Sequence, residues 1–401
     1  MPPVDIGTVD VIVPVYNQRE MVEPCLASLL EARNETPVEL VVIDDASTDD
    51  ALKASLAQLA REGRITLLTN ETNLGFTKTV NLGMRLHPDR DVLLLNSDTL
   101  VFGDWLDRLR RAAYSGPRVG TANPMTNGSH ISGYPFRQAD GQVRFEMSDA
   151  EFDALAATVR PVRRVAVHYN VGFCLYIRRA LLDAVGVFDA ENFSIGYGEE
   201  ADFCYRARRL GWQHLVTGDV FVRHWEGQSF GPRKARLMTQ MIEVFNRLHP
   251  EIGANDRDFA LRDPLRPLRE ALDLARLARL LDGATSLPCL EAGAAARGSA
   301  AALAFDCKAA TTRLVAPQLP TLASLPVFRL PEDVVGLNTV LVRLGLRGLS
   351  FEDVSLRDRF AALLRGQSCE TGIAVRLDVA AEIKPPGTSG QHTQGRMASD
   401  G

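Results

Sequence analysis

The first hundred residues alternate between short, mostly apolar runs and longer segments whose apolar residues recur at helical spacing. The apolar runs are of strand length, at 9–15, 39–43, 65–68 and 92–95, and the last of them contains no polar residue. A run without polar interruption is typical of a strand buried on both faces of a sheet. The segments between them predict helices over 20–33, 51–61 and 81–86. Strands that alternate with helices in this way predict βαβ units, and therefore an α/β fold with a mostly parallel sheet flanked by helices.

The pattern is less regular over the next 125 residues or so. It predicts helices at 105–113, 181–186 and 199–210, and strands at 165–167, within 170–179, at 213–216 and at 220–223. Residues 116–141 are rich in Gly, Pro, Asn and Ser, which predicts loops over a ligand site.

The character of the chain changes near residue 250. A length of 401 residues suggests two or three domains. We expect an α/β domain over 1–250, a smaller C-terminal domain of uncertain class over 251–383, and a disordered tail over 384–401, where no apolar pattern remains. The C-terminal domain begins with an amphipathic helix over 263–282, whose outer side carries arginines at 266, 269, 276 and 279.

Composition narrows the class of protein. The net charge of −5 gives no general attraction to nucleic acid. Six scattered cysteines form no CxxC pair, so we expect reduced core thiols and a cytoplasmic protein rather than a disulfide framework or a structural zinc site. The N-terminus lacks the features of a signal peptide, and no apolar run approaches the ~20 residues that cross a bilayer.

The run at 92–95 ends abruptly in Asn96, Ser97 and Asp98. A carboxylate at the carboxyl end of a buried parallel strand lies at the edge where open α/β sheets bind ligands. One carboxylate there can hold a divalent cation that takes its other ligands from water and a diphosphate. Because Asn96 and Ser97 are neutral, such a cation would need a second protein ligand. An ordinary loop position is the alternative for Asp98.

His224 is our candidate for that second ligand. It follows the strand predicted at 220–223 and precedes glycine-containing polar sequence. Imidazole suits manganese better than magnesium. A lone histidine is more often structural, and that alternative stays open.

Two further segments leave the same sheet edge. Asp44 follows the strand at 39–43 and can accept the imide N–H of a uracil or thymine ring, whose faces Val15 and Tyr16 would pack. The first strand passes into its loop through Pro14, Val15, Tyr16 and Asn17. Three residues of the next loop and helix would line the same side of the site: Asn73, Gly75 and Asn81. A helix cap and solvated turn is the alternative for Asp44.

Three acids open the helix predicted at 199–210: Glu199, Glu200 and Asp202. Acids in a first turn are normally exposed and favoured by the helix dipole. Phe203 and Cys204 directly behind them indicate instead that this helix is docked. A docked Glu200 can take the proton from a hydroxyl as general base, and Asp202 would hydrogen-bond either the incoming molecule or the loop beside it.

The glycine turn before the strand within 170–179 is the last candidate. Gly172 and Phe173 let backbone approach a small ligand closely, because glycine has no side chain.

Taken in order, these segments resemble those of family 2 glycosyltransferases, in particular the bacterial rhamnosyltransferase-like branch. The resemblance covers roughly residues 8 to 235 and rests on seven segments in order: 11–17, 42–49, 73–76, 95–98, 172–174, 198–202 and the segment around His224. It implies the Rossmann-like GT-A fold, a nucleotide-diphospho-sugar donor, a divalent cation (manganese or magnesium) and transfer with inversion.

Carried over residue by residue, the resemblance implies that Asp44 contacts the nucleobase, that Asp98 and His224 hold the metal, and that Glu200 is the base. The family usually has Glu-Asp where this chain has Glu199-Glu200, so the choice of base between these two stays open. The acceptor stays open among a glycan, a lipid-linked sugar and a protein. Cell-surface glycan synthesis at the inner face of the membrane is the expected setting.

The alternatives make different predictions. A dinucleotide oxidoreductase would need a GxGxxG turn after the first strand, which this chain lacks. A non-catalytic relative would bind a nucleotide sugar without turnover, and a hydrolase would release free sugar without an acceptor. The C-terminal half remains open among acceptor recognition, homo-oligomerisation and peripheral membrane contact. Interior packing of the 263–282 helix is favoured because Glu270 and Asp273 dilute its positive charge.

Overall fold

The computed structural model describes residues 7–137, 139–141, 143–194, 196, 198–225 and 242–282, and short segments after residue 288. The chain forms two compact units, one of residues 1–279 with 321–325, the other of residues 280–320 with 326–401. Residues 251–279, which their composition assigns to a C-terminal domain, are thus part of the first unit by their contacts. The expected tail at 384–401 lies outside the described residues.

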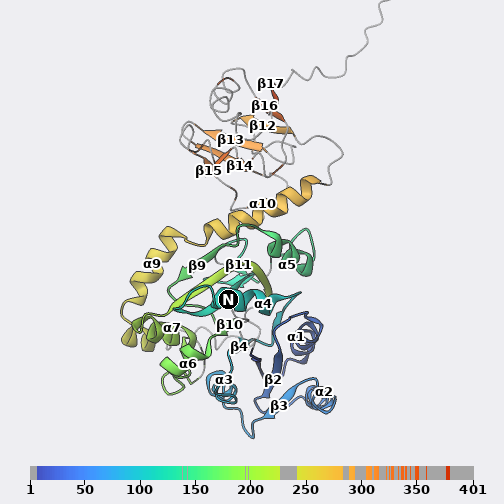
Figure 1. Ribbon diagram of the computed structural model, residues 1–401, viewed down its shortest axis with the longest axis vertical. Helices are drawn as coiled ribbons and strands as arrows, with labels where there is room; N and C mark the ends of the chain where they lie inside the picture. Colours follow the sequence, from blue (N-terminus) through green and yellow to red (C-terminus); the bar gives the residue numbers. More distant parts are fainter. Residues whose placement is uncertain are drawn as a thin grey trace, which may run out of the picture. The chain divides into compact units, whose positions relative to one another are not determined.

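The first unit is built on one nine-stranded sheet (Figure 1), in the order β3-β2-β1-β4-β10-β6-β11-β5, with β9 paired to β11. Its strands are β1 (Val9–Val15), β2 (Val38–Asp44), β3 (Thr66–Thr69), β4 (Val92–Leu95), β5 (Thr99–Leu100), β6 (Val119–Thr126), β9 (Arg164–Val167), β10 (Cys174–Ile177) and β11 (Gln213–His224). Strands β3, β2, β1 and β4 run parallel, as do β6 and β11, whereas β10, β9 and β5 pair antiparallel. The predicted α/β fold with a mostly parallel sheet flanked by helices is confirmed.

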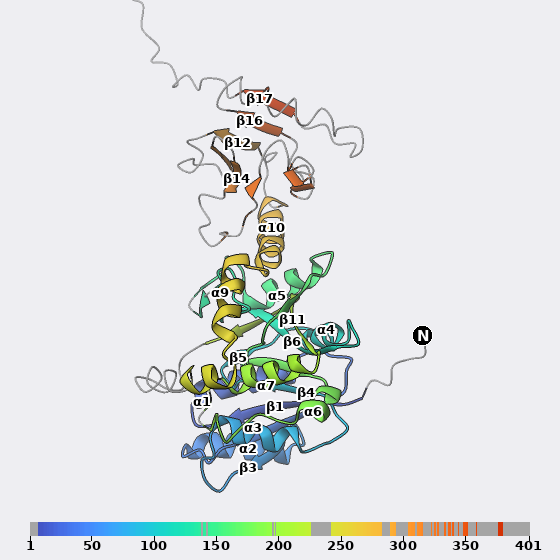
Figure 2. The ribbon, with the colours of Figure 1, turned by 90° about the vertical axis from the view of Figure 1, so that its left-hand side faces the viewer.

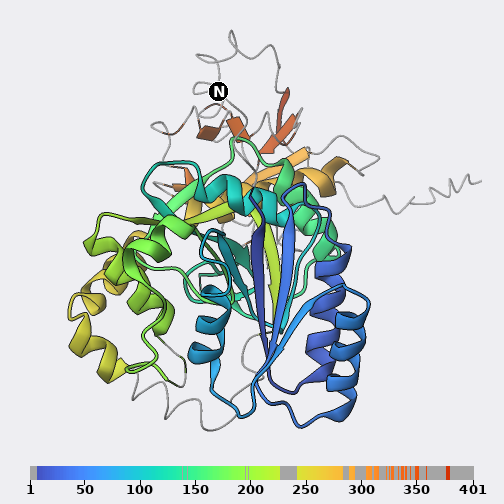
Figure 3. The ribbon, with the colours of Figure 1, turned by 60° about the horizontal axis from the view of Figure 1, so that its bottom comes forward.

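Helices cover both faces of this sheet (Figures 2 and 3). They are α1 (Arg19–Glu31), α2 (Asp50–Arg61), α3 (Phe76–Met84), α4 (Trp105–Ala113), α5 (Asp149–Thr158), α6 (Arg179–Val185), α7 (Glu199–Arg209), α9 (Ile252–Arg262) and α10 (Arg266–Asp282). The short strands β7 (Gly128–Ser129) and β8 (Ala139–Asp140) pair outside the main sheet.

Alternate residues of each central strand enter opposite cores, as the two-residue period of a strand requires. On β1, Val11 and Val13 belong to one core cluster, with side chains of α1, α2 and α4, whereas Ile12 belongs to the other, with side chains of α3, α5, α6 and α7. The mostly apolar runs of the sequence are therefore strands of a sheet buried on both faces. Gly83 of α3 is required here, because a Cβ at this position would lie 2.8 Å from the Ile12 side chain.

The prediction of loops over 116–141 is wrong for its first part. Residues 119–126 form the fully buried strand β6 between β10 and β11. Its polar side chains are satisfied inside the protein, since the Asn123 amide donates to Val171 O and Cys174 O and Thr121 Oγ1 contacts His214 Nδ1 at 2.7 Å. Composition alone does not reveal such partners.

The structure differs from the sequence prediction in three other places. The two strands predicted at 213–216 and 220–223 are one strand, β11, whose pairing with β6 is irregular between Val216 and Phe221. The sequence pattern did not predict α5 or α9. Arg269 and Arg276 of α10 are buried rather than outward, and Arg276 pairs with Glu146 and Tyr134. Interior packing, the favoured alternative for this helix, therefore holds for these two arginines.

The second unit contains a six-stranded mixed sheet, whereas the sequence left the class of this part open. Its order is β15-β14-β13-β12-β16-β17, formed by β12 (Cys289–Gly293), β13 (Ala304–Lys308), β14 (Thr311–Val315), β15 (Val327–Phe328), β16 (Gly348–Phe351) and β17 (Arg376–Val379). Among the described residues of either unit, no helix has the length and apolar character needed to cross a membrane.

Candidate functional site at the carboxyl edge of the sheet

The parallel strands β1, β2 and β4 bring three predicted segments to one edge of the sheet. Val15 and Asp44, the last residues of β1 and β2, are paired in register, and β4 runs parallel to β1 and ends at Leu95. The residues that follow these strands therefore leave the sheet on the same side, where open α/β sheets bind ligands.

The structure brings Asp98 and His224 together. Thr99 of β5 pairs with His224 at the end of β11, and the Trp225 backbone N–H donates to the Asp98 carbonyl at 3.1 Å. The His224 Nε2 atom then lies 3.5 Å from Asp98 Oδ1, and both side chains are buried. Residues more than a hundred positions apart in the sequence thus share one small site.

The orientation of the imidazole is fixed from two sides. Its Nδ1 atom lies 2.9 Å from the carbonyl of Gly128, and its ring stacks on Phe173 with centroids 5.0 Å apart. A carbonyl oxygen can only accept, so Nδ1 carries the proton and donates. Nε2 therefore faces the Asp98 carboxylate, either with the lone pair of a neutral imidazole, which suits a metal ligand, or with the N–H of an imidazolium, which pairs with the carboxylate directly.

Gly172 and Phe173 connect this pair to the start of helix α7. The Phe173 carbonyl accepts from the Asn96 N–H at 2.8 Å, so the turn before β10 is tied to the loop that carries Asp98. A Cβ on Gly172 would lie 3.9 Å from the side chain of Glu200. One short segment therefore contacts His224 through Phe173 and Glu200 through Gly172.

Glu199 and Glu200 form an interacting pair of carboxyl groups at the start of α7. Burial raises the pKa of Glu199 well above its ordinary value, and the charge of Glu200 raises it further. Burial also raises the pKa of Glu200, although backbone N–H groups, including those of Gly172 and Gly198, oppose this shift. One buried oxygen of each carboxyl, Oε2, has no hydrogen-bond partner in the described part of the chain. Such a pair holds its protons more tightly than isolated carboxyl groups do.

Asp202, on the same turn, has partners inside the protein. Its two oxygens accept from Arg206 Nε at 2.7 Å and from His249 Nε2 at 2.8 Å. These bonds anchor α7 to the segment before α9. No pattern in the sequence indicated His249, which lies 47 positions from Asp202.

The side expected to hold a nucleobase has a more exposed surface. Asp44 is buried and accepts from the Ser47 N–H at 2.9 Å, whereas Tyr16 is 49% exposed beside it on the strand exit. Pro14 and Ser97 are partly buried, and Val15 is fully buried in the core beneath the site. Of these residues, Tyr16 offers the largest free ring surface.

Asn17 and Asp45 shape this side by joining loops to one another. Asn17 Oδ1 accepts from the backbone N–H groups of Thr48 and Asp49 at 2.8 and 3.2 Å. Asp45 accepts from the N–H groups of Leu74 and Gly75 at 2.8 and 2.9 Å, which positions the loop containing Asn73. The clamp by Asp45 was not predicted, although an acid directly after Asp44 is its sequence signal.

Asn73 is exposed, and its Oδ1 accepts from the Gly75 N–H at 3.1 Å. Gly75 has a φ of +80°, and a Cβ there would lie 2.9 Å from Ser194 O. Asn81 is buried, and its amide exchanges hydrogen bonds with the backbone of Phe188 at 2.8 and 3.1 Å. Gly75 and Asn81 therefore hold the 188–194 loop against α3.

Comparison with known proteins finds a family match within this region. Residues 10–186 match glycosyl transferase family 2. Two curated relatives are an uncharacterized glycosyltransferase of Haemophilus influenzae, 28% identical over 102 residues, and glycosyltransferase GlyG of Streptococcus pneumoniae, 24% identical over 101 residues. Each alignment covers 25% of this chain and 31% or 33% of the relative. The chain thus spans about a third of the length of these relatives.

Two solved structures are found at low structural similarity. The mannosyltransferase PcManGT from Pyrobaculum calidifontis, in complex with GDP-Man and Mn2+, has a TM-score of 0.42 and 19% identity over 70% of this chain and 76% of its own. GalNAc-T7 with UDP, GalNAc and Mn2+ has a TM-score of 0.46 and 16% identity over 69% of this chain and 52% of its own.

The family 2 region contains Asp44, Asp98 and Phe173, whereas Glu200 and His224 follow it in the sequence. The fold returns both residues to the region through α7 and β11. The site geometry described above therefore extends past the matched residues.

Proposed function

We propose that this chain transfers a sugar from a nucleotide-diphospho-sugar to an acceptor hydroxyl, with inversion at the anomeric carbon. The observation that carries the proposal is the convergence of Asp98, His224 and Glu200 around Gly172 and Phe173 at the carboxyl edge of the sheet. The match of residues 10–186 to glycosyl transferase family 2 supports the same reaction class.

The Asp98–His224 pair fits a divalent cation, manganese or magnesium. A carboxylate oxygen and the nitrogen of a neutral imidazole that faces this oxygen are both suitable metal ligands. The Gly128 carbonyl bound to Nδ1 is the kind of partner that fixes a metal-binding histidine. The bound cation would supply positive charge for the departing diphosphate.

We assign the general base to Glu200. Its carboxyl lies beside Gly172, and burial raises its pKa toward the range in which a carboxylate accepts a proton readily. As the acceptor hydroxyl loses its proton, its oxygen attacks the anomeric carbon on the side opposite the leaving diphosphate, and this gives inversion. Glu199, which is more deeply buried, is the alternative base.

On the donor side, we propose that Asp44 contacts the nucleobase and that Tyr16 packs on its face. Pro14, Val15 and Asn17, together with Asn73, Gly75, Asn81, Asn96 and Ser97, shape the donor site. We propose that Gly172 and Phe173 border the acceptor, and that Asp202 acts on it only through the position of α7. The acceptor class is a glycan, a lipid-linked sugar or a protein, in cell-surface glycan synthesis on the cytoplasmic side.

The test is a panel of UDP-, dTDP- and GDP-sugars, assayed for binding by calorimetry and for turnover, with and without manganese. At least one nucleotide sugar should bind in a manganese-dependent way. Asp98→Ala should abolish this dependence, whereas the matched control Asp89→Ala, an exposed acid at the other edge of the sheet, should retain it. The proposal fails if Asp98→Ala and the wild type bind all donors equally.

A further inference from the structure

The first turn of α7 carries both candidate bases, Glu199 and Glu200, without the side-chain cap that often holds the start of a helix. Its N-cap residue is Gly198, which has a φ of +120° and no side chain that could accept from the first N–H groups. Backbone N–H groups of this turn instead meet the two carboxyl groups and oppose the rise in their pKa that burial causes. The turn that holds the proposed base is therefore not fixed by a cap of its own.

Asp202, in the same turn, connects it to a residue outside the helix. The Asp202 carboxylate is buried and accepts from His249 Nε2 at 2.8 Å, in addition to the bond from Arg206 within α7. His249 is 1% exposed and directly follows the helical segment 242–248. A side chain 47 positions further along the chain thus holds the first turn of α7.

The same imidazole also contacts the last turn of α7. The Arg209 guanidinium lies 3.0 Å from His249 Nδ1, and a guanidinium can only donate, so Nδ1 accepts and carries no proton. The ring proton is then on Nε2, which donates to Asp202. Because Asp202 lies in the first turn and Arg209 in the last, one ring bridges the two ends of the helix.

Aromatic side chains fix the position of this ring. Its centroid lies 4.9 Å from that of Phe245 and 5.1 Å from that of Tyr205 on α7. Phe245 in turn packs on Phe193, with ring centroids 6.1 Å apart. A Cβ on Gly198 would lie 3.0 Å from Phe193 and 3.5 Å from Phe245. The segment that ends at His249 therefore packs directly against the start of α7.

We propose that His249 is a positioning residue for the transfer reaction, because it holds the first turn of α7 and so keeps the Glu200 carboxyl beside Gly172. This inference rests on the function proposed above. Since His249 is almost completely buried, it acts through Asp202 and the backbone of α7 rather than by contact with a substrate.

The test compares two substitutions of His249. His249→Phe keeps a ring between Tyr205 and Phe245 but removes both hydrogen bonds, whereas the amide of His249→Gln can both donate and accept. With manganese, His249→Phe should lower kcat, measured as release of nucleoside diphosphate, about 10- to 100-fold, as expected when a reacting group is displaced by up to about 1 Å. The donor dissociation constant from calorimetry should stay at the wild-type value, and His249→Gln should restore most of the lost kcat.

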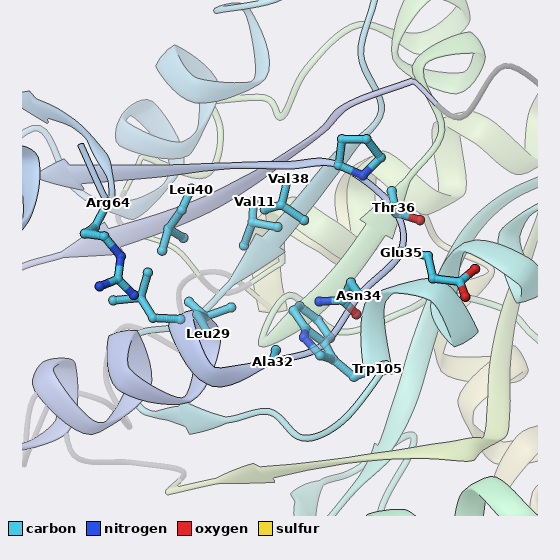
Figure 4. A pocket seen from close by; sticks show the side chains of 12 residues that line it. Val11, Leu29, Ala32, Asn34, Glu35, Thr36, Val38, Leu40, Arg64 and Trp105 are labelled. Carbon is cyan, nitrogen blue, oxygen red and sulfur yellow. The ribbon is translucent and has the colours of Figure 1, made fainter. Parts of the chain in front are cut away.

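Arg209→Ala breaks the bridge at its exposed end and can be measured even where His249→Phe fails to fold. Without the guanidinium, the ring proton can move to Nδ1, so kcat should fall about 3- to 10-fold, the size of one neutral hydrogen bond, at unchanged donor affinity. The matched control is Arg64→Ala, which should keep the wild-type kcat. Arg64 is an exposed arginine in the wall of a cavity of about 410 Å³ (Figure 4), whose lining residues all lie outside α7.

The role of His249 is overturned if His249→Phe or Arg209→Ala keeps the wild-type kcat, or if His249→Gln is as slow as His249→Phe. It is also overturned if kcat and donor affinity fall together, because a positioning residue should affect only the reaction step. A wild-type protein that turns over no nucleotide sugar would overturn the function proposed above, and this role with it. Wild-type turnover that persists in His249→Phe would overturn the role of His249 alone.

Discussion

The acidic side chains at the two edges of the central sheet differ in the partners they have within the protein. At the amino edge, Asp10 is bound by Arg90 and His87, each at 2.9 Å, and Glu39 is bound by Arg90 and Thr66. At the carboxyl edge, by contrast, Asp98 faces a histidine at 3.5 Å, and the Glu199–Glu200 pair keeps unpartnered buried oxygens.

The difference separates a cluster that is paired within the protein from the one to which we assign the proposed function. Asp10, Glu39 and His87 have the spacing of a metal site, but the Arg90 guanidinium already supplies the positive charge among them. Among the described residues, no arginine or lysine is paired with Asp98, Glu199 or Glu200, and Asp98 faces His224 instead. Buried acids without a partner of opposite charge are typical of sites that bind a ligand or react, because such unpaired groups lower the stability of the fold.

The largest expected effect is at the carboxyl edge. Glu200→Gln should lower kcat about 1,000-fold while the donor dissociation constant changes little, since a general base contributes 10²–10⁴-fold. Stopped assays of transfer with manganese, paired with donor titrations, measure both quantities. The matched control Glu191→Gln, an exposed acid on the loop before α7, should keep full turnover.

If Glu200→Gln retained turnover and Glu199→Gln lost it, the base would be Glu199. If both variants retained turnover, this edge would not be the catalytic one, and the contrast between the two edges would lose its functional meaning.

The next effect, at the amino edge, should be on stability instead. Arg90→Ala should lower the free energy of unfolding by about 3–5 kcal/mol, because it leaves the fully buried Asp10 carboxylate without its guanidinium. Urea denaturation measures the change. The exposed pair Arg111–Asp104 is the control, and Arg111→Ala should cost less than about 1 kcal/mol.

Turnover per folded molecule of Arg90→Ala should equal that of wild type. A variant that folded normally but lost manganese-dependent turnover would instead place a metal site at Asp10, Glu39 and His87.

The contrast also shows which parts of the fold can be predicted from the sequence. The bounds of β1, β4 and α4 were predicted to the residue, because each is a continuous apolar or amphipathic run with a clear end. Strand β6 was missed, since its Thr and Asn side chains are satisfied by partners about 50 or more positions away. The apolar pattern of a segment predicts which apolar side chains are buried, but it does not predict the burial of polar side chains whose partners lie elsewhere in the chain.

The site was predictable to a similar degree. The ends of predicted strands indicated Asp44 and Asp98. The structure places His224 beside Asp98, as expected for the candidate second ligand. The residues that orient these groups, Gly128 and His249, carried no local signal. Supporting contacts depend on loop paths, which the apolar pattern does not specify.

The pH dependence of stability tests the Glu199–Glu200 pair. The folded-state pKa of Glu199 lies well above its ordinary value, so the folded protein binds the proton more tightly than the unfolded chain does. Stability is therefore full below the ordinary carboxyl pKa, and is lost by up to about 1.4 kcal/mol per pH unit as pH rises toward the raised folded value.

Glu199→Gln should flatten this loss, since glutamine does not titrate, and should make the protein more stable than wild type at alkaline pH. Thermal melts across pH measure the slope. An unchanged slope would mean that Glu199 is not the group responsible, whereas a steeper one would contradict the assigned direction of its shift.

The smallest expected effect returns to the amino edge, where Asp91 has more partners than it needs. Tyr114 and Tyr176 both donate to Asp91 Oδ2, at 2.8 and 2.6 Å, and the Arg179 N–H donates to Oδ1 at 2.8 Å. Tyr114 is 44% exposed whereas Tyr176 is fully buried, so water can replace the hydroxyl only of Tyr114. Tyr114→Phe should cost less than about 0.5 kcal/mol and Tyr176→Phe about 1–2 kcal/mol in urea denaturation, because an accessible charged acceptor recovers hydration. Equal losses of stability in the two variants would show that water replaces neither hydroxyl, and that Asp91 needs both tyrosine hydrogen bonds.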